Sequence, residues 1–266
     1  MLSGFLDIIH GANSRSWIER LNQEVTPKQK HLGEKNLMGN MQGVFSWLDS
    51  LKSETYQTAV VANYHSPGGE VSIGCRQHTA IITVMEHILQ GQQLDIERFE
   101  FYDDFSFNLD AQLEEYCYLV AGCVGEFWTE IGFISMGSFA NVDQVKMNRW
   151  GINYGKGLQL INILRDLSKD LENGRCYLPG VDVADRSQVI REATRWRMRA
   201  RDYLKEGATY ADALVHRRTR MATALPGIIG ARTLDLLDQA DWAALEAGIK
   251  VSRSQVYLSA WDAFIR

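Results

Sequence analysis

Gln159-Leu160-Ile161-Asn162-Ile163-Leu164-Arg165-Asp166-Leu167-Ser168-Lys169-Asp170 places four polar residues, Gln159, Asn162, Asp166 and Asp170, in an otherwise apolar helical pattern. At about 100° per residue, these four side chains fall within roughly 80° of arc on a helix. Leucine and isoleucine fill the remaining directions, so the pattern predicts a helix that is buried nearly all round. Because buried carboxylates need partners, the stripe predicts a binding site. A solvated helix face is the alternative interpretation.

The chemistry of the stripe points to a metal and a phosphate. Asn162, Asp166 and Asp170 are spaced four residues apart, which puts their oxygen atoms about 6 Å apart along a helix axis. Mg²⁺ prefers oxygen ligands of this kind and often bridges to substrate phosphates. Arg165 and Arg175 add the forked donors that suit phosphate oxygens. We therefore expect a diphosphate held through Mg²⁺.

Composition limits the class of protein. The chain has 266 residues, 45% of them hydrophobic and 23% charged, which is ordinary for a globular protein. The net charge of −5 argues against nucleic-acid binding. No apolar run reaches the length of a membrane span, and the N-terminus does not look like a signal peptide, so we expect no transmembrane segment. The four cysteines have no C-x-x-C spacing, which favours free thiols and a cytoplasmic location.

Helical periodicity covers most of the chain. The pattern predicts a loop at 99–108 and no strand with period-2 alternation. The fold class that we predict is all-α, with one domain over residues 1–266. The expected helices span 3–23, 27–51, 70–92 (ending at Gly91), 109–137, 143–172, 185–214, 217–237 and 252–265.

A second segment, Tyr116-Cys117-Tyr118-Leu119-Val120-Ala121-Gly122-Cys123-Val124-Gly125, carries small residues at nearly helical spacing. Ala121, Gly122 and Gly125 would let another helix or a long ligand approach closely. Tight helix packing is the favoured interpretation, and the wall of an apolar tunnel is the other.

This segment, followed by Asn162-x-x-Arg165-Asp166-x-x-x-Asp170-x-x-x-Gly174-Arg175-x-Tyr177-Leu178-Pro179, resembles the squalene/phytoene synthase family. Weaker similarity covers Gly91-x-x-x-Asp95 and Val251-Ser252-Arg253. The resemblance implies an isoprenoid-synthase-type helical bundle around a central cavity. It also implies that two aspartate-rich motifs hold Mg²⁺ and prenyl diphosphates, and that two prenyl chains are joined head to head.

Roles follow from the resemblance, residue by residue. Asp166 and Asp170 would form the second aspartate-rich motif and act in catalysis together with Tyr116, at the position of the family's active-site tyrosine. Asp166, Asp170 and Asn162 would be the metal ligands. The substrate-binding positions implied in the same way are Gln159, Arg165, Arg175, Tyr177 and Val120, the last as a tunnel-wall residue.

The chain departs from the family at the first motif, and its N-terminal part looks shortened. The best equivalent is the segment from Arg15 to Glu24, which contains no aspartate. Arg15 would keep a phosphate role, and Glu19 with Gln23 keeps the four-residue spacing. An acidic cluster at Asp103, Asp104 and Asp110 is interpreted as solvated.

One complete metal motif favours a Mg²⁺-dependent prenyltransferase that uses a single prenyl diphosphate and transfers or rearranges the allylic group. The acceptor would be a non-prenyl small molecule, aromatic in one version. Head-to-head condensation of two prenyl diphosphates is one alternative, and a non-catalytic binding or assembly protein is another. The sequence leaves open the prenyl chain length, the acceptor, the metal competence of the altered motif and the oligomeric state.

The basic run His216-Arg217-Arg218-Thr219-Arg220 would attract diphosphate or anionic lipid, or would simply be an exposed helix face.

Overall fold

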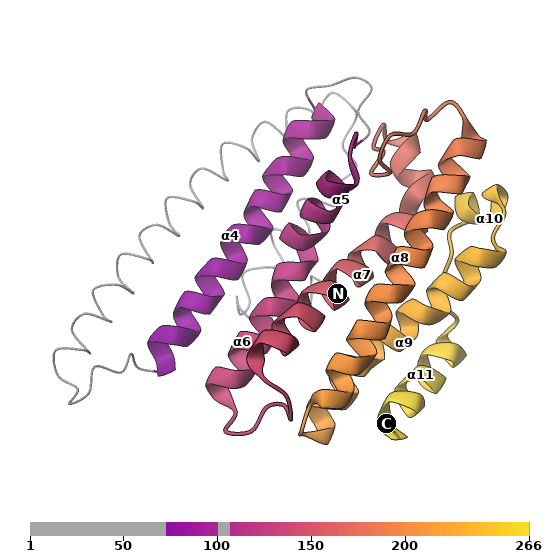
Figure 1. The fold of residues 1–266 in the computed structure, drawn as a ribbon. Helices are drawn as coiled ribbons and strands as arrows, with labels where there is room; N and C mark the ends of the chain where they lie inside the picture. The colour runs from indigo at the N-terminus through magenta and orange to yellow at the C-terminus, as the bar shows by residue number, and fades with distance from the viewer. Residues whose placement is uncertain (1–72, 101–106, 266) are drawn as a thin grey trace, which may run out of the picture. The chain divides into compact units, whose positions relative to one another are not determined.

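The computed structural model describes residues 73–100 and 107–265, and every regular element in them is helical. An isolated bridge between Ala140 and Leu214 is the one β-type pairing among these residues. The all-α prediction is confirmed. Figure 1 shows the elements α4 (Ile73–Glu100), α5 (Asp110–Cys117), η1 (Tyr118–Gly122), α6 (Cys123–Ser135), α7 (Gln144–Glu172), α8 (Arg186–Ala213), α9 (Arg217–Gln239), α10 (Trp242–Ala247) and α11 (Arg253–Ile265).

Several boundaries match the sequence pattern closely, among them those of α7, α8, α9 and α11. The expected helices at 3–23 and 27–51 lie outside the described residues. The prediction that α4 ends at Gly91 is wrong, because the helix continues through this glycine to Glu100. The expected helix at 109–137 is interrupted by the π-helical turn η1, and the short helix α10 was not predicted.

The helix α7 lies at the centre of the described bundle, between α6 and α8 in Figure 1. It also contacts α9 and α10. Leucine and isoleucine side chains of its second half are buried on several sides, as the apolar pattern around the stripe predicts. Asp143 begins the helix by accepting a hydrogen bond from the backbone N–H of Lys146 at 2.9 Å. The central helix therefore carries the polar stripe.

Glycines bring η1 and α6 close to α7. A Cβ atom added at Gly125 would lie 1.9 Å from the carbonyl oxygen of Gly151, and one at Gly155 would lie 2.2 Å from that of Ala121. No side chain fits at either position, so the backbones touch directly. Tight helix packing, the favoured interpretation of the small residues in 116–125, is confirmed.

The apolar stretch Asp110–Ser135 is long enough to cross a membrane by length and composition alone. The expectation of no transmembrane segment, which rested on uninterrupted apolar runs, stays a prediction. The stretch packs against α4 and α7, and core helices of soluble proteins pass the same test. The described cysteines, Cys117, Cys123 and Cys176, are buried free thiols. All described residues belong to one unit of contacts, while a single domain over 1–266 stays a prediction.

Candidate functional site

The polar stripe forms on α7 as predicted. Asn162 is exposed, while Gln159, Asp166 and Asp170 are half-buried. Asn162 donates from Nδ2 to Oε1 of Gln159 at 3.5 Å, which links two members of the stripe. The stripe is therefore neither a dry core face nor a fully solvated one. It is a partly accessible row of oxygen atoms on a buried helix.

Arg165 and Asp166 form a two-point ion pair at the middle of the stripe. Nε and Nη2 of Arg165 donate to Oδ1 and Oδ2 of Asp166 at 3.0 and 2.6 Å. The pair raises the pKa of Arg165, since the carboxylate stabilises the charged guanidinium. Both side chains stay accessible, at 37% and 44% exposure. An incoming cation can therefore reach Asp166 if Arg165 turns toward another anion.

The carboxyl group of Asp170 is harder to ionise than a free one. Burial, followed by repulsion from Asp166, raises its pKa to about 6. Asp95 adds to the repulsion, and Arg175 and Lys169 offset part of it. Carboxylates from α4 and α7 thus lie near enough to repel one another, and Arg175 and Lys169 lie near them. A bound cation would relieve the repulsion that Asp170 receives from Asp166 and Asp95.

Asp95, on α4, organises the opposite side of the site. It is 9% exposed and accepts from Arg175 Nη1 at 3.0 Å and from the hydroxyl of Tyr177 at 2.7 Å. The ring of Tyr177 stacks on that of Tyr116, with centroids 5.1 Å apart and planes 22° apart. Asp95, which had no assigned role, thus brings together Arg175 and Tyr177 and, through the ring of Tyr177, Tyr116. The weak Gly91-x-x-x-Asp95 similarity was the signal for it.

A turn after α7 returns Arg175 and Tyr177 toward Asp95. Gly174 has a φ of +74°, in the left-handed region that favours glycine. Its N–H donates to the carbonyl of Leu171 at 3.0 Å, and the N–H of Arg175 donates to the carbonyl of Asp170 at 2.8 Å. These bonds close the end of the helix in the manner of a glycine C-cap. The Gly174-Arg175-x-Tyr177 motif is therefore the turn that completes the site.

Tyr116 is held as a neutral phenol. Burial, together with the negative charge of Asp95 and contact with Tyr177, raises its pKa far above the ordinary value. Phe107 lies against both tyrosines, with ring centroids 6.1 and 6.0 Å away, and Phe99 meets Tyr177 at 5.0 Å. The acids on α7 thus lie beside a cluster of four aromatic rings. The π faces of such rings attract cations.

Val120, the expected tunnel-wall residue, is buried in η1. A Cβ atom added at Gly91 would lie 2.7 Å from one of its methyl groups, so Val120 packs directly on α4. This contact explains why a glycine sits in the middle of α4. The role of Val120 in a tunnel stays a prediction, as does the central cavity. Arg15 and Glu19 lie outside the described residues.

The donor set fits Mg²⁺ bound together with a phosphate. In residues 73–100 and 107–265, no three His, Cys, Asp or Glu side chains are grouped closely enough to hold a metal alone. Mg²⁺ sites commonly use one or two carboxylates and complete the shell with water and substrate phosphate. Asp166 and Asp170 supply two carboxylates, and Asn162 supplies an amide oxygen. The charges of Asp166 and Asp95 repel that of Asp170, and a cation bound beside Asp170 would offset this repulsion.

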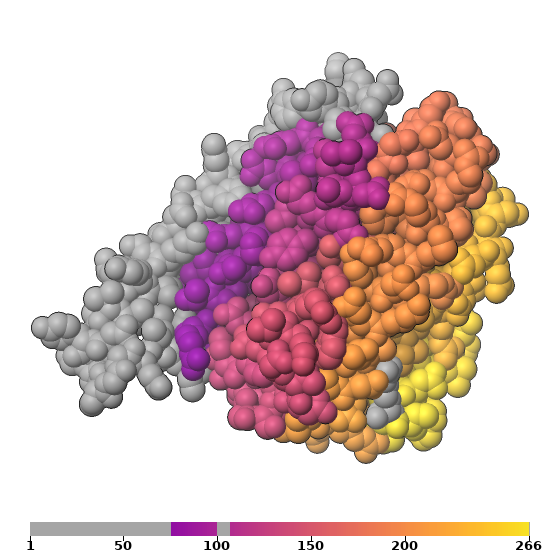
Figure 2. All heavy atoms as spheres, viewed as in Figure 1, coloured from indigo at the N-terminus to yellow at the C-terminus, as the bar shows by residue number. Residues whose placement is uncertain are grey.

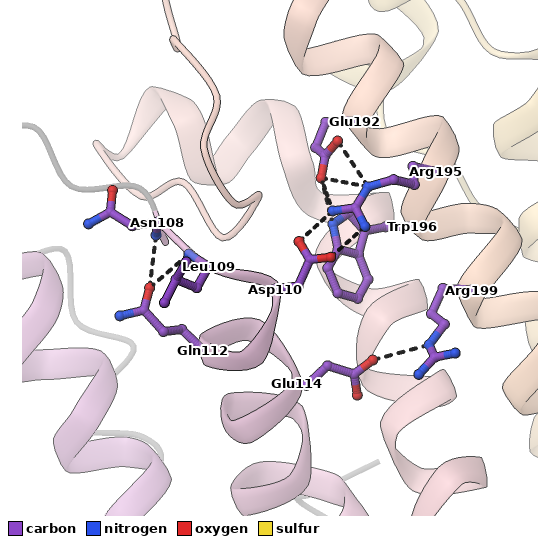
Figure 3. Close-up of polar contacts among 9 residues, drawn as sticks. All are labelled: Asn108, Leu109, Asp110, Gln112, Glu114, Glu192, Arg195, Trp196 and Arg199. Atoms are coloured by element: carbon purple, nitrogen blue, oxygen red, sulfur yellow. Dashed lines mark hydrogen bonds and ion pairs between the residues drawn. The ribbon is translucent and has the colours of Figure 1, made fainter.

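A second polar network, on the other side of α5, fixes that helix to α8 (Figure 3). Asp110 is exposed, as expected of a solvated acid, but it also accepts from Nη1 of Arg195 at 2.6 Å. Glu114 accepts from the hydroxyl of Tyr203 at 2.7 Å and from Nε of Arg199 at 3.1 Å, and it also pairs with Lys156. These contacts hold α5, and with it Tyr116, against the bundle. Asp103 and Asp104 lie outside the described residues.

Replacing Asp95 by asparagine is expected to lower the free energy of unfolding by about 2–3 kcal/mol, because Arg175 then loses its buried counter-charge. Chemical denaturation of the wild type and the variant measures the difference. Asp202→Asn is the matched control, since Asp202 pairs with Lys205 on the exposed surface of α8 and its replacement should cost about 0.5 kcal/mol or less. Equal losses in the two variants would contradict the organising role of Asp95.

The sequence matches the squalene/phytoene synthase family over residues 28–262. A phytoene synthase of Thermus thermophilus is 41% identical over 83 residues, which cover 29% of this chain and 26% of that protein. A chloroplastic phytoene synthase of an Oncidium hybrid is 28% identical over 135 residues, covering 48% of this chain and 31% of that protein. The matched segments thus span about a quarter to a third of these relatives.

Solved structures share the fold. A dehydrosqualene synthase in complex with a ligand superposes with a TM-score of 0.54 at 22% identity, over 68% of this chain and 64% of that one. A squalene synthase from Alicyclobacillus acidocaldarius gives a TM-score of 0.52 at 18% identity, over 73% of each chain. The predicted isoprenoid-synthase-type helical fold is confirmed. Because the family match covers most of the sequence, the chain belongs to the squalene/phytoene synthase family.

Proposed function

We propose that the protein is a Mg²⁺-dependent transferase that binds prenyl diphosphates on the polar stripe of α7 and joins two prenyl chains head to head. The observation that carries the proposal is the grouping of Asp166 and Asp170 on α7 with Asp95 and Arg175. Family membership supports the reaction, since the relatives named above are phytoene, squalene and dehydrosqualene synthases.

Asp166 and Asp170 would hold the metal, with Asn162 beside them. Bound there, Mg²⁺ would neutralise charge on the diphosphate and so favour the departure of pyrophosphate. Arg165 would leave Asp166 and donate its two parallel N–H groups to phosphate oxygens. Arg175, which is held in place by Asp95, would direct its positive charge at the diphosphate. The residues on α7 and the turn after it thus stabilise the leaving pyrophosphate, which takes the electron pair of the broken C–O bond.

The allylic cation would form beside the aromatic cluster of Tyr116, Tyr177, Phe107 and Phe99. Ring faces stabilise positive charge without offering a nucleophile strong enough to trap it. The raised pKa of Tyr116 keeps its hydroxyl protonated at neutral pH, so this residue would orient or stabilise the substrate and would not act as a base. The buried surroundings also keep water, a competing nucleophile, away from the cation.

A single prenyl diphosphate with a non-prenyl acceptor is the second candidate. The segment from Arg15 to Glu24 favours it, because it offers no aspartate for a second metal motif. Gln159 and the other substrate-binding positions serve either reaction. The buried free thiols of Cys117, Cys123 and Cys176 support a cytoplasmic location as part of the proposal.

The decisive test is the product formed from prenyl diphosphates of several lengths in the presence of Mg²⁺. Released pyrophosphate is measured by a coupled assay, and the organic product is identified by mass spectrometry. We expect pyrophosphate release and a hydrocarbon with twice the carbon number of the substrate, because both prenyl chains come from the same pool.

Other outcomes separate the candidates. A cyclised product, or a prenyl group transferred to an added aromatic acceptor, would overturn head-to-head condensation in favour of the second candidate. If no chain length yields pyrophosphate and Mg²⁺ does not promote binding of a prenyl diphosphate, the protein is a non-catalytic family member. A parallel reaction with EDTA in place of Mg²⁺ is the control for metal dependence.

A further inference from the structure

The helix α11 exposes an apolar face that the bundle does not use. It packs chiefly against α9, at the edge of the described bundle, where its atoms are visible on the surface in Figure 2. Ser259 and Ala263 are buried on the inner side. The outer side carries five large apolar residues, exposed by 43% to 74%: Tyr257, Leu258, Trp261, Phe264 and Ile265.

These residues form one continuous stripe. At about 100° per residue, the five side chains and Arg253 fall within roughly 140° of arc, while Ser259 and Ala263 lie on the opposite arc. The rings of Trp261 and Phe264 stack, with centroids 5.7 Å apart and planes 26° apart. The helix is therefore amphipathic in the reverse sense, with small residues toward the protein and large apolar residues toward the outside.

Arginines lie at both ends of this stripe. Arg253 is exposed at the first turn of α11. Arg217, the first residue of α9, lies over the ring of Phe264 at 4.1 Å and donates to the carbonyl oxygen of that residue at 3.0 Å. Arg218 follows it and is exposed. The acid of the same helix, Asp262, is already paired with Arg232 at 2.8 Å.

We propose that the outer face of α11 docks on a lipid bilayer that contains anionic lipids. Tryptophan and tyrosine favour the boundary between head groups and acyl chains, and leucine, isoleucine and phenylalanine reach the acyl chains. The local arginines give this surface a positive charge although the whole chain has a net charge of −5, so it matches an anionic lipid surface. A symmetric contact between two copies would instead place these arginines against one another. The anionic lipid head groups would also be the partner of the basic run at 216–220.

The surface is separate from the stripe on α7, so its test does not depend on catalysis. Purified protein is mixed with vesicles of phosphatidylcholine alone, or of phosphatidylcholine and phosphatidylglycerol in equal amounts, and bound protein is measured by sedimentation. We expect binding to the anionic vesicles that weakens as salt is raised. Trp261→Ser should weaken binding about tenfold, and Arg253→Gln about fivefold.

Met198→Ser is the matched control, because Met198 is an equally exposed apolar residue, 59% accessible, on α8. It should bind like the wild type, and circular dichroism checks that each variant is folded. The proposal is overturned if the wild type binds neither kind of vesicle, or if Met198→Ser loses as much binding as Trp261→Ser. Light scattering measures the oligomeric state. A dimer of the wild type that dissociates in Trp261→Ser would also overturn the proposal, because a second copy would then cover this face. Enzymatic activity without vesicle binding would refute the docking surface and leave the proposed function intact.

Discussion

Replacing Asp170 by asparagine is expected to lower the rate of pyrophosphate release by about a thousandfold, since a metal ligand contributes several kcal/mol to charge stabilisation. Asparagine has nearly the shape of aspartate and keeps one carbonyl oxygen, but it removes the negative charge that attracts a cation. Asp170 lies in the stripe beside Asp166, and burial followed by repulsion from Asp166 raises its pKa to about 6. Its loss should therefore affect metal binding more than folding.

The same substitution is expected to stabilise the metal-free protein. The pKa of Asp170 is raised from 3.8 to about 6, so the folded state favours the neutral acid. This contribution to stability is fully present below pH 3.8 and is lost as the pH rises through about 6. Above that pH, the charged group costs about 1 kcal/mol once solvent screening is allowed for. Asparagine removes this cost, which corresponds to about 2–4 °C in melting temperature.

Thermal unfolding with and without Mg²⁺, at about pH 5 and about pH 7.5, measures both effects. We expect Asp170→Asn to melt above the wild type at the higher pH without Mg²⁺, and Mg²⁺ with pyrophosphate to stabilise the wild type alone. Glu172→Gln is the control, since Glu172 is an exposed acid on α7 that lies off the stripe. A variant that retains activity, or that responds to Mg²⁺ like the wild type, would show that Asp170 is not a metal ligand.

Replacing Gly125 by alanine is expected to lower the free energy of unfolding by about 4 kcal/mol, enough to reduce the melting temperature by about 8 °C or more. The new Cβ atom would lie 1.9 Å from the carbonyl oxygen of Gly151 and 2.4 Å from its carbonyl carbon. Both are backbone atoms of a central helix, so no side chain can turn away. The helices α6 and α7 would have to separate.

Gly137→Ala is the matched control, because a Cβ atom at Gly137 meets nothing within 4 Å. Its melting temperature should stay close to that of the wild type. Circular dichroism followed during heating, on both variants in the same buffer, gives the comparison. If the two variants melt together, the contact between Gly125 and Gly151 does not hold the helices at the separation described above.

The sequence alone was sufficient for the parts of the fold that local pattern controls. The stripe at 159–170 lies on a helix because isoleucine and leucine recur around it, and Asp143 and Gly174 begin and end that region through local backbone chemistry. Arg165 and Asp166 are adjacent in sequence. Such features need no knowledge of which helices are neighbours, so periodicity and capping residues predict them.

Features that depend on distant partners were missed or misjudged. Asp95 lies 80 positions before Arg175, and nothing local indicates that the two side chains meet. Gly91 looked like a helix end because glycine usually weakens helices. In the folded protein, it is the point where Val120 reaches α4, and packing outweighs propensity. The pairing of Asp110 with Arg195 was invisible for the same reason.

The π-helical turn at Tyr118–Gly122 sets a constraint on how this chain can change in evolution. The extra residue rotates everything after it relative to everything before it. Upstream, Tyr116 must meet Tyr177, and downstream, Gly125 must meet Gly151. Deleting one residue between these points would restore an ordinary helix and misalign one contact or the other. The spacing between the tyrosine and the glycine is therefore constrained, and so is the size of the side chain at 120, which must fit against Gly91 of α4.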